Sequence, residues 1–277
     1  MTYATVMVSL AIDQPNEARL AIAGQIAEMF DAGMIGIAAA LFSPPLYFTD
    51  GENAQMVIDQ GEALIKRRLS ELEAQFRQAA RDRAKHVEWR GATDFPARYV
   101  LAQARSADII VSGGRREAIS DPFTTIAPKD LVMEAGRPLL VVPDSLDWLD
   151  PRSVLVAWKD TAEARKAIVA SLPMLRKAKD VTVAEIMEQD GDRRTAAARV
   201  RDVVTWLSRH GIRASELVAA KDHDRNVFAQ LDSMAGDVGA GLIVAGAYGH
   251  SRFRELILGG MTQHLISQTA RCVLLSR

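Results

Sequence analysis

The chain has 277 residues, a formal net charge of −1, and a composition of 48% hydrophobic and 25% charged residues. These values fit a globular protein of one large or two ordinary domains, and they give no basic field that would attract nucleic acid or an anionic membrane. The sequence has a single cysteine, no basic stretch followed by an apolar run at its start, and no apolar segment as long as a membrane-spanning helix. We therefore expect a cytoplasmic protein without an intrachain disulfide.

Short apolar runs alternate with segments of helical periodicity in the first half of the chain. We predict strands over residues 5–12, 34–41, 86–90, 108–112 and 138–142. We predict helices over residues 17–30, 54–85, 95–107 and 129–135. Strands that alternate with helices are typical of βαβ units and a parallel sheet.

The same pattern restarts after an interruption at residues 143–151, which hold two prolines and three aspartates. Beyond it we predict strands over residues 153–157, 181–186, 214–219, 242–245 and 272–275. Helices are expected over residues 161–172, 192–210 and 226–235, with a last one around 261–266. The sequence thus predicts an N-terminal domain at residues 1–143, a linker at 144–152 and a C-terminal domain at 153–277.

The two halves also share local sequence. Residues 108–113 (DIIVSG) match residues 241–246 (GLIVAG), and residues 136–141 (GRPLLV) match residues 270–275 (ARCVLL). The chain therefore contains an internal repeat of about half its length, which predicts two domains of one architecture.

A glycine-rich segment follows the strand predicted at residues 242–245. Gly246 and Gly249 come first, and Gly259 and Gly260 precede the last predicted helix. Glycine lets an anion approach the backbone, and the N–H groups of a first helical turn point at such an anion, so the segment indicates a phosphate site. Two glycine pairs are equally typical of tight turns between packed elements. The segment matches neither the P-loop nor the dinucleotide-binding fingerprint.

The spacing Gly246-x2-Gly249-x9-Gly259 resembles the adenine-nucleotide motif of the universal stress protein family, G-x2-G-x9-G-[ST]. Gly260 stands where the ATP-binding members of that family carry Ser or Thr, so this sequence departs from the pattern at one γ- or β-phosphate contact. Thr262 substitutes for that hydroxyl only if the start of the helix is shifted. Together with the element order and the repeat, the resemblance covers essentially the whole chain and indicates two tandem domains of this family.

The resemblance implies an α/β fold with a five-stranded parallel sheet of order 3-2-1-4-5 in each half, of the Rossmann-like (adenine nucleotide alpha hydrolase-like) type. Ligands of such open sheets bind where the strand order reverses, outside the carboxyl ends of the strands. It also implies ATP as the ligand, with or without Mg²⁺. Universal stress domains commonly pair through their fifth strands, so residues 139–142 are expected to pair with residues 273–275 and to make the chain a pseudo-dimer in itself. Whether the chain also forms a homodimer is open.

We expect the nucleotide site in the second half. Its candidate residues come from the ends of the first two strands of that half and from the glycine-rich segment: Ala157, Trp158, Lys159, Asp160, Ile186, Gly246, Gly249, His250, Ser251, Gly259, Gly260, Met261 and Thr262. Glu185 is a further candidate for the adenine edge, beside Ile186. The family usually has an Asp directly after the first strand, whereas here Lys159 takes that place and Asp160 follows it.

Several of these residues have two interpretations. Lys159 meets a phosphate as a point charge and Asp160 accepts a ribose or metal contact, or both belong to a solvated loop. Trp158 stacks on adenine or packs on the other domain. We interpret Thr161 as a helix N-cap, because the helical periodicity starts directly behind it.

The first half keeps an Asp after its first strand, Asp13, but not the glycines. Arg116, and Thr125 or Ile126, stand where the second half has its second and third glycines. Side chains at these positions crowd a phosphate, and the prolines nearby remove N–H donors. We therefore predict that the first half does not bind nucleotide in the manner of the family.

Three functions follow from these observations. The first is a non-catalytic stress-response or regulatory protein that binds one adenine nucleotide in its second half. The second is a nucleotide-free module for dimerisation or partner docking, in which Gly260 and Lys159 mark a decayed site. The third is a slow ATP hydrolase, for which Asp160 and Glu185 are the evident general bases. No metal site is expected, because the five histidines show no spacing typical of metal ligands.

Overall fold

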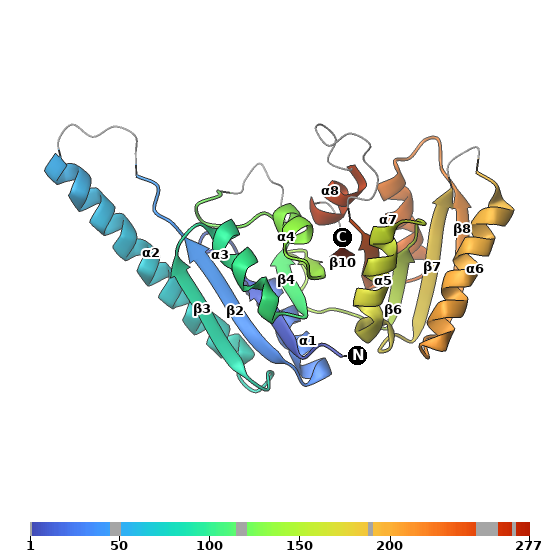
Figure 1. The fold of residues 1–277 in the computed structure, drawn as a ribbon, viewed down its shortest axis with the longest axis horizontal. Helices are drawn as coiled ribbons and strands as arrows, with labels where there is room; N and C mark the ends of the chain where they lie inside the picture. Colours follow the sequence, from blue (N-terminus) through green and yellow to red (C-terminus); the bar gives the residue numbers. More distant parts are fainter. Residues whose placement is uncertain (1, 45–50, 115–120, 188–190, 248–259, 268–269) are drawn as a thin grey trace.

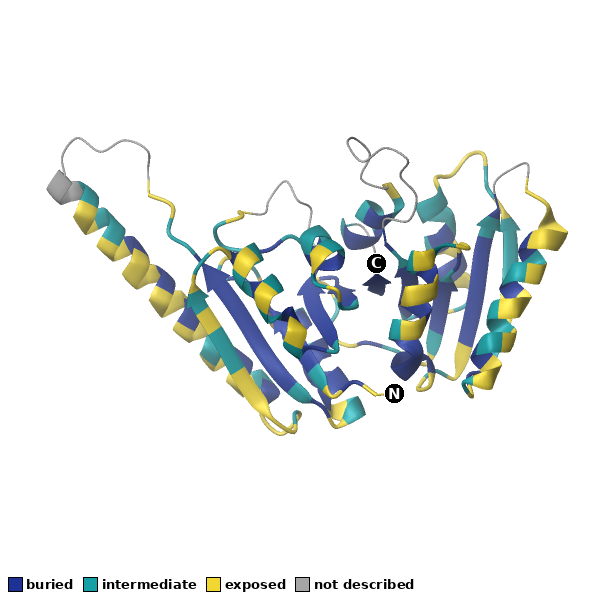
Figure 2. Cartoon of the chain, viewed as in Figure 1, coloured by how far each residue is buried: buried dark blue, intermediate teal, exposed yellow. Residues whose placement is uncertain are grey.

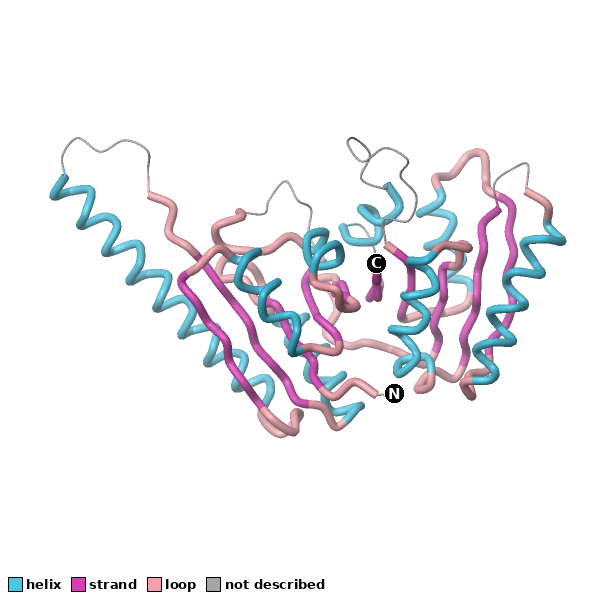
Figure 3. Tube along the Cα trace, in the orientation of Figure 1, coloured by secondary structure: helices cyan, strands magenta, loops and turns pink. Residues whose placement is uncertain are grey.

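The computed structural model describes residues 2–44, 51–114, 121–187, 191–247, 260–267 and 270–277. Helices and strands alternate along both halves of the chain, as the tube in Figure 3 shows. Within the described residues, no helix combines the length and the apolar character that crossing a bilayer requires.

The N-terminal half contains the elements expected for it. These are β1 (Thr5–Ser9), α1 (Glu17–Phe30), β2 (Gly33–Ala40), α2 (Gly51–Ala80), β3 (Val87–Thr93), α3 (Pro96–Gln103), the short 3-10 helix η1 (Ala104–Ser106), β4 (Ile109–Gly113), α4 (Pro128–Glu134) and β5 (Leu139–Val142). Helix α2 ends five residues before the predicted boundary, because Asp82 has a φ of 62°, in the left-handed region that a helix does not accommodate. The first turns of α3 and α4 each contain a proline, which is tolerated there because the first N–H groups of a helix have no partner within it.

The C-terminal half repeats the arrangement. It comprises β6 (Ser153–Ala157), α5 (Ala162–Leu175), β7 (Asp180–Met187), α6 (Arg193–Arg209), β8 (Ala214–Ala220), α7 (Val227–Asp237), β9 (Leu242–Gly246), α8 (Gly260–Ser267) and β10 (Cys272–Ser276). Helix α5 continues through Pro173, beyond its predicted end at residue 172. The repeated sequences at residues 108–113 and 241–246 form β4 and β9, the equivalent strands of the two halves.

All described strands belong to one ten-stranded sheet, in the order β3-β2-β1-β4-β5-β10-β9-β6-β7-β8. Figure 1 shows the two halves side by side, with the long helix α2 extending past the edge of the sheet. Each half is parallel within itself and has the order 3-2-1-4-5 when its strands are counted separately. The predicted fold class is therefore confirmed, while the domain boundaries at residues 143 and 153 stay a prediction.

Helices cover both faces of the sheet, and each face has its own hydrophobic core. The side chains of β1 illustrate the division, since Val6 and Val8 belong to the core under α1, α2, α5 and α6, and Met7 belongs to the core under α3, α4, α7 and α8. This alternation follows from the two-residue period of a strand. The central strands are buried on both faces, whereas the edge strands β3 and β8 carry exposed residues (Figure 2).

The two halves join through their fifth strands. Strands β5 and β10 pair antiparallel, with Leu139 opposite Leu275 and Val141 opposite Val273, which confirms the predicted pairing. The segment before β6 is fixed to α1 by Gln25, whose side chain accepts from Leu149 N at 2.9 Å and donates to Leu149 O at 2.6 Å. The Tyr3 hydroxyl donates to Ala170 O at 2.7 Å and adds a contact between the halves.

The cysteine of β10 makes the stability of the protein depend on pH. Burial raises the pKa of the Cys272 thiol from 9.0 to about 12. Above about pH 9 the unfolded chain loses this proton and the folded chain keeps it, so the free energy of unfolding falls as the pH rises. We expect the free energy of unfolding to decline less steeply with pH in Cys272→Ala, by up to about 1.4 kcal/mol per pH unit. Urea denaturation between pH 8 and 10.5 measures this slope. The same decline in both proteins would contradict the assignment.

Candidate functional site

A cleft opens at the carboxyl ends of the strands in the C-terminal half, where the strand order reverses between β6 and β9. Its volume is about 380 Å³, within the range of small-molecule sites. We call it the strand-end cleft. It is lined by Ala157, Trp158, Lys159, Thr161, Ala164, Ala184, Ile186, Lys221, Val227, Leu231, Ala245, Gly246, Gly260, Met261, Thr262 and Leu265.

The strand-end cleft combines an apolar lining with two basic side chains. Small and aliphatic residues at the ends of β6, β7 and β9 and on α7 provide most of the surface. Lys159 lies two residues beyond the end of β6, and Lys221 directly follows β8. An ammonium group can meet an anionic ligand as a point charge, and aliphatic side chains suit a flat apolar ring.

Gly246 is required for packing. A Cβ atom at this position would lie 2.5 Å from the backbone nitrogen of Ala164 and 2.7 Å from the carbonyl carbon of Glu163. The end of β9 therefore approaches the first turn of α5 more closely than any other residue type permits. The glycine at the start of the motif positions a helix against a strand, at the wall of the cleft.

Gly260 has a different environment. It is the first residue of α8, it is exposed, and a Cβ atom built on it meets no atom of the described residues within 4 Å. Met261 and Thr262 complete the part of α8 that lines the cleft, and Thr262 is buried. The first turn of α8 thus borders the cleft, and the backbone N–H groups of a first turn are suited to an anion.

The structure brings together eight of the predicted site residues: Ala157, Trp158, Lys159, Ile186, Gly246, Gly260, Met261 and Thr262. Asp160 does not line the cleft, and its carboxylate forms an ion pair with Arg165. Glu185 does not line the cleft either; it is buried and pairs with Arg199 of α6. Asp160 and Glu185 line a neighbouring cavity, which shares Lys159 and Ile186 with the cleft. Gly249, His250, Ser251 and Gly259 lie outside the described residues.

The structure confirms one interpretation of the residues after β6. The Thr161 hydroxyl accepts from Ala164 N at 3.3 Å, so Thr161 is the N-cap of α5, as predicted. Trp158 is only 8% exposed and lines the cleft, and the choice between stacking on adenine and packing on the other domain stays a prediction.

Sequence reasoning missed several residues of the cleft, above all Lys221. The sequence could have identified Lys221, because it follows a predicted strand and the carboxyl ends of parallel strands meet at one edge of a sheet. Val227 and Leu231 of α7 carried no such signal, since their spacing is that of any core-facing helix.

The equivalent region of the N-terminal half is filled by an arginine. Arg19 is 3% exposed, and its guanidinium donates to Ser9 O at 3.1 Å and to Gln14 Oε1 at 3.2 Å. It also contacts Gly113 at the end of β4. Arg19 is the third residue of α1, and the third residue of α5 is Ala164, whose methyl group leaves that space open.

No protein-family model matches the sequence, and no curated protein matches it. Solved structures nevertheless match the fold along its whole length. A universal stress protein from Archaeoglobus fulgidus DSM 4304 has a TM-score of 0.70 at 15% identity, with 99% of this chain and 96% of that chain covered. A putative universal stress protein from Pseudomonas aeruginosa UCBPP-PA14 has a TM-score of 0.58 at 14% identity, with 99% and 93% covered. The chain therefore has the fold of these two universal stress protein structures from end to end.

Proposed function

We propose that this chain is a tandem universal stress protein that binds ATP in the strand-end cleft of its C-terminal half and has no dedicated catalytic activity. The observation that carries the proposal is the coincidence of three features at one strand-order reversal. These are an apolar lining, the two lysines Lys159 and Lys221, and a glycine-initiated helix. A stress-response role rests on the shared fold alone, and the cytoplasmic location stays a prediction.

The lining of the cleft suggests how ATP is held. The adenine ring lies against aliphatic side chains such as Ile186 and Leu231, which remove its faces from water. The phosphates lie toward Lys159, Lys221 and the first turn of α8, where ammonium groups and backbone N–H groups balance their charge. Mg²⁺ would be bound mainly through the phosphates, as that ion prefers.

The contacts of Asp160 and Glu185 favour the non-catalytic role over ATP hydrolysis. Asp160 is paired with Arg165 and Glu185 with Arg199, and neither carboxylate lines the strand-end cleft. A general base has to accept a proton from the attacking water, whereas both of these carboxylates are held in ion pairs with arginines. We propose further that the N-terminal half binds no nucleotide, because the Arg19 side chain occupies the equivalent space.

The first experiment distinguishes a nucleotide-binding protein from an interaction module. The purified protein is denatured, and the released small molecules are separated and detected by their absorbance at 260 nm, with a parallel sample reconstituted with ATP and desalted. An adenine nucleotide retained by the native protein supports the proposal. Absence of nucleotide in both samples favours a module for dimerisation or partner docking.

Gly260 offers a gain-of-function test. A serine at this position meets no steric obstacle among the described residues, and it supplies the hydroxyl that the resembling motif carries. We expect Gly260→Ser to tighten ATP binding by about tenfold to a hundredfold, since a hydrogen bond to a charged group contributes roughly 1.5–3 kcal/mol. Gly260→Ala, which adds the same carbon without the hydroxyl, should leave the affinity close to its original value. Equal affinities of the serine and alanine variants for ATP, measured by titration calorimetry, would contradict this role of Gly260.

A further inference from the structure

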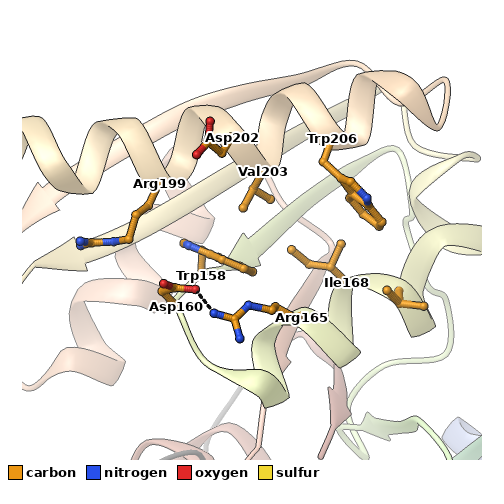
Figure 4. A pocket seen from close by; sticks show the side chains of 9 residues that line it. Trp158, Asp160, Arg165, Ile168, Arg199, Asp202, Val203 and Trp206 are labelled. Atoms are coloured by element: carbon orange, nitrogen blue, oxygen red, sulfur yellow. Dashed lines mark hydrogen bonds and ion pairs between the residues drawn. The ribbon is translucent and has the colours of Figure 1, made fainter.

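A second cavity lies between α5 and α6, on the face of the sheet beyond Trp158. We call it the α5–α6 cavity; its volume is about 420 Å³. Its lining residues are Trp158, Asp160, Arg165, Ile168, Val169, Arg199, Asp202, Val203 and Trp206. Figure 4 shows Arg165 and Ile168 on one helix facing Arg199, Val203 and Trp206 on the other, with Trp158 between them. The nucleotide site proposed above lies on the other side of Trp158, which lines both cavities.

The walls of the α5–α6 cavity are mainly apolar. Ile168 is buried, Val203 and Trp206 are half-buried, and Val169 at the opening is 45% exposed. Two indole rings and three branched aliphatic side chains provide surfaces suited to a flat, apolar ring system. A cavity of this size is large enough for a small molecule of one to three fused rings.

The indole N–H of Trp158 needs a hydrogen-bond acceptor. Its side chain is 8% exposed, and its indole Nε1 is buried without a hydrogen-bond partner among the described residues. In the view of Figure 4 this nitrogen lies on the side of Arg199 and Asp160, at the polar end of the cavity. A buried N–H without an acceptor destabilises the protein, so a ligand that supplies an acceptor gains binding energy there.

The charges around the cavity argue against a charged ligand. Two arginines and two aspartates line it, so the lining has no net formal charge. Arg165 is paired with Asp160, and Arg199 with Glu185. An ionic ligand would have to give up its hydration without a field of opposite sign to replace it.

From these observations we infer that the α5–α6 cavity is a second ligand site, for a neutral planar heteroaromatic molecule that accepts a hydrogen bond from Trp158 Nε1. The apolar walls hold the faces of the ring, and the indole N–H selects the position of the acceptor. This inference does not depend on nucleotide binding at the strand-end cleft.

The test uses two probes of nearly the same shape. Quinoline has one ring nitrogen that accepts a hydrogen bond and is neutral at pH 7.5, and naphthalene has none. Both are titrated into the nucleotide-free full-length protein, and binding is followed by two-dimensional amide NMR. We expect saturable shifts at residues of the cavity, such as Ile168 and Val203, with quinoline bound about tenfold more tightly than naphthalene, the effect of one neutral hydrogen bond.

Two variants assign the effect to the cavity. Trp158→Phe keeps an aromatic wall without the N–H, and it should reduce the affinity for quinoline to that for naphthalene. Val169→Trp, at the exposed opening, should weaken the binding of both probes by obstructing the entrance, and it should leave the fold intact because residue 169 is 45% exposed. If neither quinoline nor naphthalene caused saturable shifts up to its solubility limit, the inference would be overturned. Unchanged preference for quinoline in Trp158→Phe would overturn the role of the indole N–H.

Discussion

Replacing Gly246 with alanine is expected to lower the free energy of unfolding by about 1–3 kcal/mol, the usual range for an added carbon in a tightly packed site. The physical reason is the contact of β9 with the first turn of α5. The added Cβ would lie 2.5 Å from Ala164 N and 2.7 Å from Glu163 C, and both of these atoms are backbone, which cannot rotate away. The measurement is urea denaturation followed by far-UV circular dichroism.

Gly260→Ala is the matched control, because it adds the same carbon to a glycine of the same segment. A Cβ atom at Gly260 lies within 4 Å of no atom in the part of the chain that the structure describes, and alanine favours a helix more than glycine does. This variant should therefore be neutral or more stable by up to about 1 kcal/mol. If both variants lost the same stability, the close packing of Gly246 would not be the cause.

The tight packing of Gly246 also limits what its substitution can show about the glycine-rich segment. A loss of nucleotide binding in a Gly246 variant would reflect displacement of α5 as well as any direct contact with a phosphate. Substitutions at Gly260 and at the lysines of the cleft therefore report on the ligand more directly than substitutions at Gly246.

Reversing the charge of both lysines in the strand-end cleft, in Lys159→Glu with Lys221→Glu, is expected to weaken ATP binding about a hundredfold. Each reversal replaces an attraction to the phosphates by a repulsion. A tenfold change in affinity corresponds to only about 1.4 kcal/mol, which is a small part of the interaction between two close charges near a protein surface. Titration calorimetry at low ionic strength measures the effect, which added salt should diminish because it screens exposed charges.

The control is a double variant with the same change in net charge. Lys166→Glu with Lys179→Glu alters two exposed lysines of the same half that do not line the cleft. Its affinity for ATP should stay within about threefold of the unmodified protein, given the screening of distant surface charges. An equal loss in both double variants would mean that ATP responds to the overall field and not to the cleft.

The fold was largely predictable because its signals are local and repeated. Each buried strand is a short apolar run, each helix has an apolar stripe, and the repeat of residues 108–113 at 241–246 places two domains of one type in succession. Element ends were less predictable. Asp82 ends α2 through its backbone conformation, and Pro173 remains inside α5, and neither outcome follows from hydrophobic periodicity.

The candidate site was predictable only in part, because it depends on contacts between residues far apart in the sequence. Thr161 was identified correctly from a local capping pattern. The packing role of Gly246 depends on the position of α5, some eighty residues earlier in the chain. The sequence did not indicate that Arg19 fills the equivalent region of the N-terminal half, since an arginine near a helix start is usually exposed.

The central claim, one nucleotide site in the C-terminal half, is tested most directly by the stoichiometry of Mg²⁺-ATP binding in titration calorimetry of the full-length protein. We predict saturable binding of about one ATP per chain that Lys159→Glu with Lys221→Glu abolishes over the same concentration range. Two ATP molecules per chain would contradict the proposal that Arg19 occupies the equivalent space in the N-terminal half. No binding at millimolar ATP would contradict the nucleotide site itself.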